Sequence, residues 1–385
     1  MHRLLLIFSL ALFFSCGESR DSKTSGTRNI LENLSYSIDT VVVDPGDEII
    51  NIKRGARFST VSLDAQKYYY YDYDKTSIHE IDLETLKLTD THQFSKEGPN
   101  SIGFNPPKIQ PLSDERFLFV SSGINVGTFN KKGEKEKSLK FNFREIEGLE
   151  EEGEGLITYN AQISENEKLL FALTRPDMVS SDVRLIIIDP DTKTGKSISL
   201  PEFIPTLNFK IRLQTEKEVW GVGEGVNLKI LKDQLFISST TNSDTYIYDY
   251  HSDSLRLVEF PHQLVPDRKI AEVKNKVEDK AEFYAEWAKF KYQISFAEFL
   301  WDKERQQYFR FAYQLIPRDD PNLEDKSEVF LFAYDKDLNL IGESQLENVE
   351  YRFQSPFFKD GKLYSYVNVE DELGFAVFTF DFEEK

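Results

Sequence analysis

Residues 184–196 read RLIIIDPDTKTGK, and this stretch contains the parts of a complete β-hairpin. It begins with a run of branched aliphatic residues, which favour the pleated, half-buried surface of a strand. Asp189 and Pro190 then start a turn, because an Asp side chain bonds nearby backbone N–H groups and proline restricts φ. A second, more polar strand follows. The stretch therefore predicts an antiparallel pair of strands whose turn begins at an Asp.

The same pattern occurs six times along the chain, at intervals that indicate a repeated unit. The turn residues of neighbouring copies lie 46 to 60 residues apart, except for one interval of 86 residues. Four-stranded sheets that repeat at about 40–50 residues are typical of a β-propeller. The related copies are IHEIDLETLKLTD (78–90), VGTFNKKGEKEKS (126–138), YIYDYHSDSLRLV (246–258), FLFAYDKDLNLIG (330–342) and the truncated VFTFDFEEK (377–385).

The repeats predict an all-β fold: a six-bladed β-propeller of four-stranded antiparallel blades, closed by an N-terminal strand and carrying one helical insertion. The last repeat begins near residue 352 and lacks room for a fourth strand, whereas residues 35–43 (SYSIDTVVV) form a strand without a nearby hairpin partner. Joining both in one sheet avoids exposed edges. A seven-bladed ring would need a further complete repeat within 201–223, and a pair of β-sandwiches would not explain six similar hairpins.

The composition of the 385-residue chain fits one large β domain and excludes one class of partner. Hydrophobic residues make up 40% of the sequence and aromatic residues 14%, which supplies a large core and favours strands. The formal net charge of −19 repels phosphate backbones, so we expect no nucleic-acid binding. The same charge favours solubility and can attract cations or basic partners.

The first residues have the pattern of a bacterial lipoprotein signal peptide. Arg3 precedes an apolar stretch, 4–14, that is too short to cross a bilayer. Residues 12–16, LFFSC, resemble a lipobox in the relaxed form common in the Bacteroidetes, although Phe14 is bulky where the strict motif has a small residue. Cys16 is the only cysteine in the chain, which suits lipid attachment. The alternative is ordinary signal cleavage beside an incidental cysteine.

These observations divide the chain into a lipoprotein signal peptide (1–15), a flexible tether (16–33) and a propeller domain (34–385). The tether is polar and lacks apolar periodicity, as flexible linkers do. We expect the lipid on Cys16 to hold the protein at a membrane of the cell envelope, most simply the outer membrane, facing either the periplasm or the cell surface. The membrane is therefore one expected partner.

The repeats resemble those of the six-bladed, TolB-like propeller lipoproteins of the Bacteroidetes, a group that includes an uncharacterised family of this length. Residues 97–104, EGPNSIGF, are similar to a Gly-Glu-Gly-Pro element that joins blades in that group, and 223–227 and 153–155 look like degenerate copies. The resemblance spans roughly residues 35–385. It implies the fold and the compartment, and it implies no activity or catalytic residue.

The one long interval between repeats contains a segment of another kind. Apolar residues in 266–292 are spaced close to a period of 3.6, which predicts a helix inserted in the ring. Its end carries Tyr284, Trp287 and Phe290, an aromatic face that is costly to expose. That face either docks on the rim of the propeller, or it forms a lid over the central funnel or a surface for a partner.

No motif in the sequence locates a catalytic or metal site, and we expect no cofactor. The histidines lie at no metal-ligand spacing, and a GxSxG motif is absent. Pairs such as Asp189 and Asp191 lie at hairpin turns, where Asp is favoured for its backbone hydrogen bonds; the alternative is calcium ligation. The tyrosines 68–71 alternate faces in a strand, which favours packing between blades over stacking on sugars.

The leading hypothesis is a membrane-anchored binding module for an unknown protein or small molecule, since a propeller presents a site at its loops and central funnel. The alternative is an enzyme, such as a calcium-dependent, lactonase-like hydrolase or a lyase, and a third possibility is a structural component of an envelope complex. Acids and amides that converge on the funnel from several inner strands would favour the enzyme. Fold alone does not decide between these functions.

Overall fold

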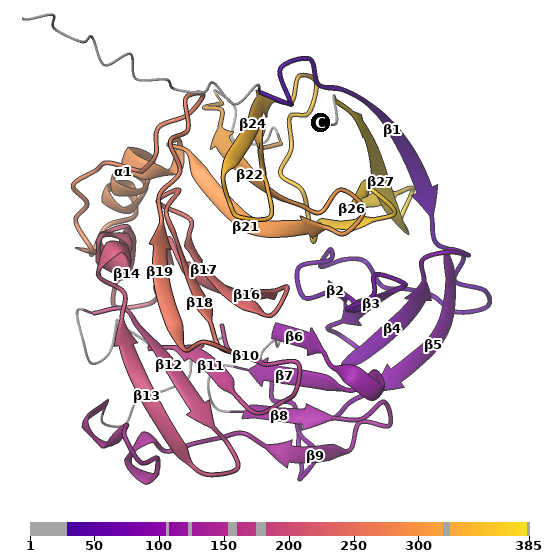
Figure 1. Ribbon diagram of the computed structural model, residues 1–385, viewed down its shortest axis with the longest axis vertical. Coiled ribbons are helices and arrows are strands. Elements are labelled where there is room, and N and C mark those ends of the chain that lie inside the picture. The colour runs from indigo at the N-terminus through magenta and orange to yellow at the C-terminus, as the bar shows by residue number, and fades with distance from the viewer. Residues whose placement is uncertain are drawn as a thin grey trace, which may run out of the picture.

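The computed structural model describes residues 29–104, 108–121, 125–152, 160–174, 182–318 and 324–382. This part of the chain is mostly β-strand, joined by hydrogen bonds into six four-stranded sheets and one three-stranded sheet. Figure 1 shows the four-stranded sheets arranged around a common centre. The predicted signal peptide, Cys16, most of the predicted tether and the element at 153–155 lie outside the described residues.

We number the four-stranded sheets in the order in which the chain enters them, beginning with β2. Within each sheet, neighbouring strands are antiparallel, so that every sheet consists of linked hairpins. Sheet 1 consists of β2 (Thr60–Val61), β3 (Lys67–Asp72), β4 (Ser77–Asp82) and β5 (Lys87–Gln93). Sheet 2 consists of β6 (Lys108–Pro111), β7 (Phe117–Ser121), β8 (Asn125–Phe129) and β9 (Lys135–Ser138). Sheet 3 consists of β10 (Gln162–Ile163), β11 (Leu170–Leu173), β12 (Arg184–Asp189) and β13 (Thr194–Ser199). Among the described residues of the first half, three short 3-10 helices connect elements: η1 (Ser113–Glu115), η2 (Phe143–Glu145) and η3 (Glu150–Glu152).

The second half of the chain continues the same plan. Sheet 4 consists of β16 (Val226–Leu231), β17 (Gln234–Ser239), β18 (Thr245–Asp249) and β19 (Ser254–Val258). Sheet 5 consists of β21 (Ser295–Asp302), β22 (Gln307–Leu315), β23 (Ser327–Tyr334) and β24 (Leu340–Gln345). Sheet 6 consists of β25 (Phe357–Lys359), β26 (Lys362–Val369), β27 (Glu372–Asp381) and β1 (Ser35–Val42).

Several hairpin turns are built around an Asp side chain, as their sequences predict. Asp189 Oδ1 accepts hydrogen bonds from the backbone N–H groups of Asp191 (2.9 Å) and Thr192 (3.0 Å). Asp82 and Asp249 accept the equivalent bonds at their own turns. These bonds satisfy backbone donors that the turn would otherwise leave unpaired. The interpretation of these Asp residues as turn residues is therefore confirmed.

Strand β1 supplies the fourth strand of sheet 6. It pairs with β27 along its whole length, from Ser35 opposite Asp381 to Val42 opposite Gly374. In Figure 1, β1 runs along the outside of β27, which brings the beginning and the end of the described chain into one sheet. The β-branched sequence of residues 35–43 thus forms a strand with a partner more than 300 residues away along the chain.

The residues just before β1 are fixed to sheet 5. Ile30 donates its backbone N–H to Ile341 O in β24 (2.9 Å), and Leu31 is fully buried in the core between sheets 5 and 6. Gly342 permits this approach, because a Cβ there would lie only 2.8 Å from Leu31 Cγ. The chain therefore bridges two neighbouring sheets before it enters β1.

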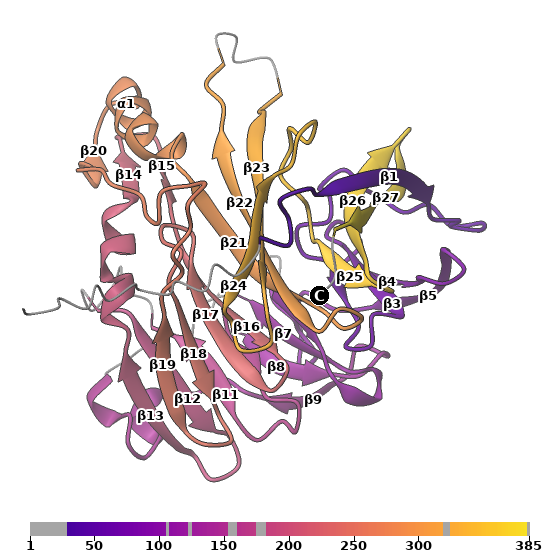
Figure 2. The ribbon, with the colours of Figure 1, turned by 45° about the horizontal axis from the view of Figure 1, so that its top comes forward.

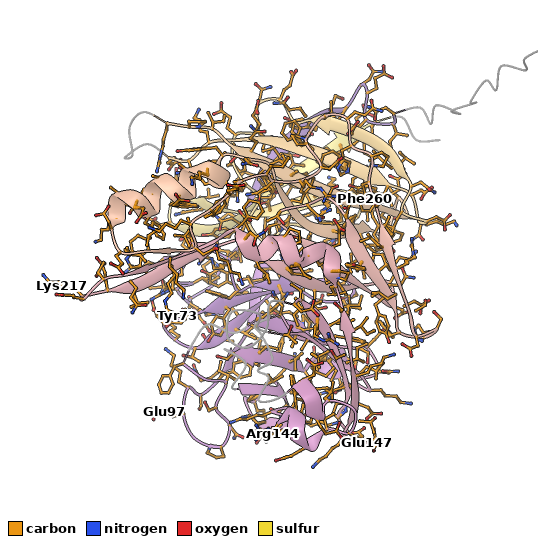
Figure 3. The ribbon with its side chains drawn as sticks, turned by 90° about the vertical axis from the view of Figure 1, so that its left-hand side faces the viewer. Tyr73, Glu97, Arg144, Glu147, Lys217 and Phe260 are labelled. Carbon is orange, nitrogen blue, oxygen red and sulfur yellow. The ribbon has the colours of Figure 1, made fainter. Side chains whose placement is uncertain are left out.

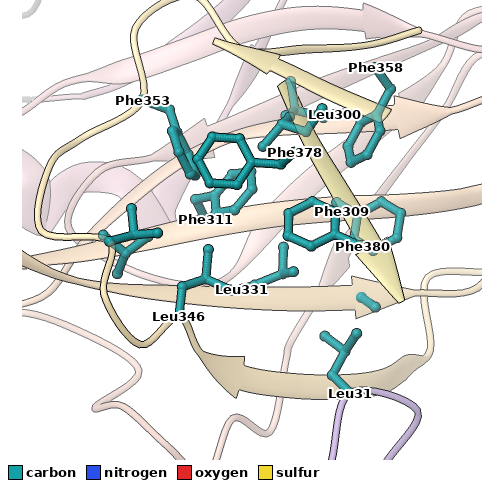
Figure 4. Packing of buried hydrophobic residues seen from close by; sticks show 14 of the residues in the cluster. Leu31, Leu300, Phe309, Phe311, Leu331, Leu346, Phe353, Phe358, Phe378 and Phe380 are labelled. Carbon is teal, nitrogen blue, oxygen red and sulfur yellow. The ribbon is translucent and has the colours of Figure 1, made fainter. Parts of the chain in front are cut away.

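Apolar side chains fill the spaces between neighbouring sheets. The tyrosines of β3 are all buried, and they alternate: Tyr68 and Tyr70 pack toward sheet 6, whereas Tyr69 and Tyr71 pack toward sheet 2. The expected packing between blades is thus confirmed. Figure 4 shows the equivalent contact between sheets 5 and 6, where aromatic rings of β22, β25 and β27 meet aliphatic side chains of both sheets.

A separate substructure interrupts the repeat between sheets 3, 4 and 5. It consists of the 3-10 helix η4 (Pro201–Asn208), the hairpin of β14 (Lys210–Gln214) and β15 (Val219–Gly223), the short strand β20 (Lys276–Val277) and helix α1 (Lys280–Lys291). β14 lies between β15 and β20 in a three-stranded sheet, and α1 packs on it through Phe283 and Phe290. Figure 3 shows Lys217 at the projecting tip of the hairpin, and Figure 2 shows α1 beside it.

The helix is shorter than the sequence predicts. We expected it over 266–292, and the structure places it at Lys280–Lys291 only. Asp279 begins it as the N-cap, because its side chain accepts a hydrogen bond from the N–H of Glu282 (3.0 Å). The residues before Asp279 instead pair with β14 and with the body of the protein, and Ile270 is exposed. Tertiary backbone pairing has overridden the helical spacing of that half of the segment.

Candidate functional site: the central pocket

A pocket of about 1100 Å³ lies where the first strands of the six four-stranded sheets meet. Residues of β2, β6, β10, β16, β21 and β25, or directly adjacent to them, line it, with two further aromatic residues from β22. Within the described chain, no residue of β14, β15, β20 or α1 contributes to the lining. The three-stranded sheet is therefore peripheral to the pocket, as Figure 1 also shows for β14 and α1.

One wall of the pocket, formed by sheets 2 to 4, is polar. Gln110 bonds the backbone of Ile163 in β10 twice, accepting at 2.9 Å and donating at 2.8 Å. Gln162 accepts from the N–H of Ile230 in β16 (2.7 Å) in the same way. These amides satisfy the backbone groups at the inner edges of the neighbouring strands. Amides therefore do converge on the centre, but their hydrogen bonds hold adjacent sheets together.

The opposite wall is aromatic and belongs mainly to sheets 5 and 6. We call it the aromatic wall: Trp301, Phe353, Phe357 and Phe358. Trp301 is half-buried and lies under the ammonium group of Lys232, 4.0 Å from the ring centroid. A pocket with one polar and one aromatic wall suits a ligand that has both a polar group and an apolar body.

Three charged side chains from three different sheets meet in the pocket. Lys108 of β6 lies 3.8 Å from Glu298 Oε1, and Lys229 of β16 lies 3.9 Å from Glu298 Oε2, so that one carboxylate of β21 faces two ammonium groups. The side chains of both lysines are 28% exposed and that of Glu298 is 35% exposed. These ion pairs are loose, and the three groups remain accessible from the pocket.

A bulge in β21 places Glu298 in this position. The pairing register of β21 with β22 shifts between Phe296 and Phe299, which inserts Ala297 and Glu298 outside the regular ladder. Bulges redirect side chains in this way and occur often next to functional sites. Here the irregular strand turns a carboxylate toward the lysines of sheets 2 and 4.

The fully buried Arg310 of β22 supports the bulge. Its guanidinium donates to Ala297 O (2.8 Å), to Ser239 O (3.2 Å) and to Ser243 O, and it lies within 5 Å of the rings of Phe296 and Phe299. Burial lowers the pKa of Arg310 to about 10. One side chain thus joins the bulge of sheet 5 to the β17–β18 loop of sheet 4, and it orients the segment that carries Glu298.

The electrostatic environment of Lys229 differs from that of an ordinary surface lysine. Burial lowers the pKa of its ammonium group; Glu298 raises it again and Lys108 lowers it further. The described residues that line the pocket include five basic and four acidic side chains, which gives the lining a net charge of +1. The formal net charge of the whole chain is −19. The pocket is therefore a locally cationic site within an acidic protein.

The residues predicted from the sequence as a lid or partner face lie elsewhere. Tyr284 is 54% exposed, Trp287 is half-buried, and Phe290 is buried against Phe209, with 5.6 Å between ring centroids. Phe290 therefore belongs to the core under α1 and not to an accessible face. Tyr284 and Trp287 stay a prediction for a partner surface, at the periphery and away from the pocket lining.

The sequence interpretation missed Lys108, Lys229 and Glu298. Each is a charged residue inside an otherwise apolar or amide-rich first strand of a repeat (KIQP, VNLKIL and SFAEFLWD), and this is the signal that could have found them. The described residues contain no group of three or more His, Cys, Asp or Glu side chains placed to hold one metal ion.

Sheets arranged around a pocket that is lined by their first strands define a β-propeller. The chain belongs to the DUF4221 family, a domain of unknown function, whose sequence pattern matches residues 30–345. The crystal structure of a DUF4221 family member from Bacteroides vulgatus is similar to it, with a TM-score of 0.62, 16% sequence identity and coverage of 91% of this chain and 99% of that chain.

Two further solved structures are more distantly similar to the chain. A putative exported protein from Bacteroides fragilis shares 7% identity, with a TM-score of 0.49 and coverage of 91% of this chain and 96% of that chain. A putative TolB from Agrobacterium tumefaciens shares 9% identity, with a TM-score of 0.39 and coverage of 90% and 99%. No protein with a curated description matches the chain in sequence. These likenesses concern the fold alone.

Proposed function

We propose that this protein is a lipid-anchored binding module of the bacterial cell envelope, and that its central pocket is the ligand site. The observation that carries the proposal is the pocket itself: about 1100 Å³, with a polar wall opposite an aromatic one. Small-molecule sites in proteins are usually single, concave and largely apolar with a few placed polar groups, and they measure about 300–1,000 Å³.

A neutral aromatic probe tests whether the pocket accepts ligands. We expect phenylnaphthylamine to bind with one-to-one stoichiometry and increased fluorescence. Asn227→Trp, which fills the pocket next to Lys229 with a large side chain, should reduce this binding at least tenfold, whereas Ile49→Trp on an exposed loop should not. Equal binding by both variants would mean that the probe binds outside the pocket and would remove the support for a ligand site there.

The ring that carries the pocket is, in our proposal, six-bladed and closed by β1. Support comes from the eight residue pairs that join β1 to β27 and from the contribution of all six first strands to one pocket. Deletion of residues 30–43 should lower the melting temperature of the whole domain, because it removes a strand and its buried contacts with sheet 5. Deletion of residues 17–28 is the matched control, and a wild-type melting curve for the first variant would contradict closure.

The anchor rests on Cys16 and the lipobox-like residues before it. No helix in the described ranges is long and apolar enough to cross a membrane. Each CH₂ group of an attached acyl chain contributes about 0.8 kcal/mol to membrane binding. Cys16→Ala should therefore move the protein from the detergent phase to the aqueous phase, whereas Ser19→Ala should not. Unchanged partitioning of the Cys16 variant would refute the lipoprotein assignment.

The alternative, an enzyme such as a calcium-dependent hydrolase or a lyase, makes a different demand on the pocket. Calcium prefers six to eight oxygen ligands, several of them carboxylates. The first strands instead bring Glu298 together with two lysines, a set that suits an anion better than a cation. Calcium binding that is lost in Glu298→Gln would favour the enzyme over the binding module.

A further inference from the structure

We propose that the pocket selects an organic anion with an apolar body, whose negative group lies between Lys108 and Lys229 while its apolar part lies on the aromatic wall. This inference rests on the proposed function, because it names the class of ligand for the same pocket. The chemical group that would be recognised is a carboxylate or sulfonate attached to an aromatic or aliphatic body.

Positive charge exceeds negative charge among Lys108, Lys229 and Glu298. Two ammonium groups share one carboxylate, and the separations of 3.8 and 3.9 Å exceed the usual length of a direct charge-assisted hydrogen bond, about 2.7–2.9 Å. Lys108 also donates to Leu228 O at 3.2 Å, a neutral acceptor that leaves its charge uncompensated. An anion between the lysines would supply the acceptor that Glu298 provides only in part.

The charge of Lys229 is poorly stabilised in this structure. Its side chain lies mostly within the protein, where an ammonium group loses much of its hydration, and this burial lowers its pKa. A buried charge is normally retained only when it is paired. In the described structure the ion-pair partner of Lys229 is the loosely held Glu298. A negative ligand would restore the missing compensation, which gives binding a favourable electrostatic contribution.

The two walls of the pocket match the two parts of such a ligand. The lysines belong to sheets 2 and 4, and the aromatic wall belongs to sheets 5 and 6 on the other side of the pocket. A free inorganic anion could occupy the space between the lysines but would make no contact with the aromatic wall. Three rings of that wall, those of Phe353, Phe357 and Phe358, are almost fully buried, so the body of the ligand would lie mainly on the half-buried ring of Trp301. Apolar surface that is removed from water there contributes favourably to binding.

Glu298 would compete with the anionic group of the ligand for the two lysines. Its carboxylate lies next to the two ammonium groups that the ligand anion would bind, and the bulge supported by Arg310 keeps it there. Removing its charge should therefore strengthen the binding of an anion, whereas removing either lysine should weaken it. Structural damage to the pocket would weaken binding in all three variants, so the opposite sign for Glu298 separates the two causes.

A matched pair of probes tests the inference. Anilinonaphthalene sulfonate is an organic anion, and phenylnaphthylamine has the same ring system without the sulfonate. For the full-length protein we expect the anion to bind at least tenfold more tightly than the neutral probe. Lys229→Met and Lys108→Met should each weaken binding of the anion about tenfold or more, because each removes one of the two charged donors for its negative group, and should leave the neutral probe unchanged.

Two controls and one competitor complete the experiment. Lys303→Met removes the same charge at the exposed end of the pocket and should change anion binding less than threefold, whereas Glu298→Gln should tighten it severalfold. Phenylacetate should displace the sulfonate probe, and inorganic phosphate at equal ionic strength should not. Displacement by phosphate alone would identify an inorganic anion site and overturn the proposal.

The possible failures are distinguishable. If neither probe binds in a manner that Asn227→Trp reduces, the proposed ligand site fails, and the anion inference fails with it. If both probes bind equally and the lysine variants have no effect, the pocket remains a ligand site and only the anion inference is refuted.

Discussion

Two carboxylates in this protein, Glu80 and Glu298, each face two lysines, but Glu80 belongs to a structural network and Glu298 to the proposed binding site. Glu80 of β4 is 5% exposed and contacts Lys67 at 2.8 Å and Lys131 at 3.2 Å, with His92 Nε2 at 2.9 Å. Glu298 is 35% exposed and lies 3.8 and 3.9 Å from its lysines. The residue types are the same, and the distances and the exposure differ.

The pKa values follow this difference. Burial alone would raise the pKa of Glu80, but hydrogen bonds from His92, Lys67 and Lys131 outweigh it and lower the pKa to about 2. The pKa of Lys67 is raised: burial opposes this, but hydrogen bonds to Glu115 and Glu80 prevail. The pKa of Lys229 is instead lowered by burial. The Glu80 network is thus electrostatically satisfied and stabilises the fold, whereas the pocket retains uncompensated positive charge.

The largest effect in this comparison should come from Arg310→Met, because Arg310 fixes the bulge that carries Glu298. The variant leaves three backbone carbonyls without their donor, two of them buried and that of Ala297 partly buried, and each such loss costs about 1–3 kcal/mol. We expect the free energy of unfolding, measured with urea, to fall by about 4 kcal/mol. Arg54→Met, which breaks an exposed 3.7 Å pair with Asp74, is the control and should change it by less than about 1 kcal/mol.

The paired variants Glu80→Gln and Glu298→Gln should sharpen the comparison. The pKa of Glu80 falls from an ordinary 4.5 to about 2, and this shift corresponds to about 3 kcal/mol of stability at neutral pH. Glu298 is partly exposed and loosely paired, so its replacement should cost less than about 1 kcal/mol. Similar losses in the two variants at pH 7 would show that the two sites are not electrostatically different.

The pH dependence of the Glu80 variant provides a check with a definite sign. Because the folded pKa lies below the unfolded one, the unfolded chain binds more protons between about pH 2 and 4.5, and stability falls as the pH falls through this window. The difference in unfolding free energy between wild type and Glu80→Gln should be constant above pH 5 and should vanish near pH 2. A constant difference over the whole range would contradict the assignment.

The smallest effect is expected at the lysines, and it should have opposite signs at the two sites. Lys229→Met removes a poorly compensated, partly buried charge, which Lys108 of β6 and Glu298 of β21 face, and should raise the unfolding free energy at pH 7 by about 1 kcal/mol. Lys67→Met should lower it by a similar amount. Since the folded pKa of Lys229 is lowered, the stability of wild type should rise with alkaline pH up to about 10.5, and the advantage of Lys229→Met should shrink there.

Much of the fold was predictable because its information is local. Alternating strands and turns based on Asp or Asn identify the repeated hairpins within a dozen residues, and the strand predicted at the tyrosines 68–71 is β3. The β14–β15 hairpin was not recognised, because its sequence around Trp220 lacks an Asp turn of the repeated kind. The first half of the predicted helix was wrong, because Lys276 and Val277 pair with β14.

The sequence by itself determined the repeated hairpins, the β-propeller class, the acidic surface and the lone Cys16, since composition, alternation and turn chemistry act between neighbouring residues. The tertiary structure alone decided where the pocket lies and which charges meet in it. Lys108, Lys229 and Glu298 come from three repeats, and they approach one another only because the sheets surround a common centre and a bulge redirects one strand. No local pattern encodes a distance between sheets, and the site depends on those distances.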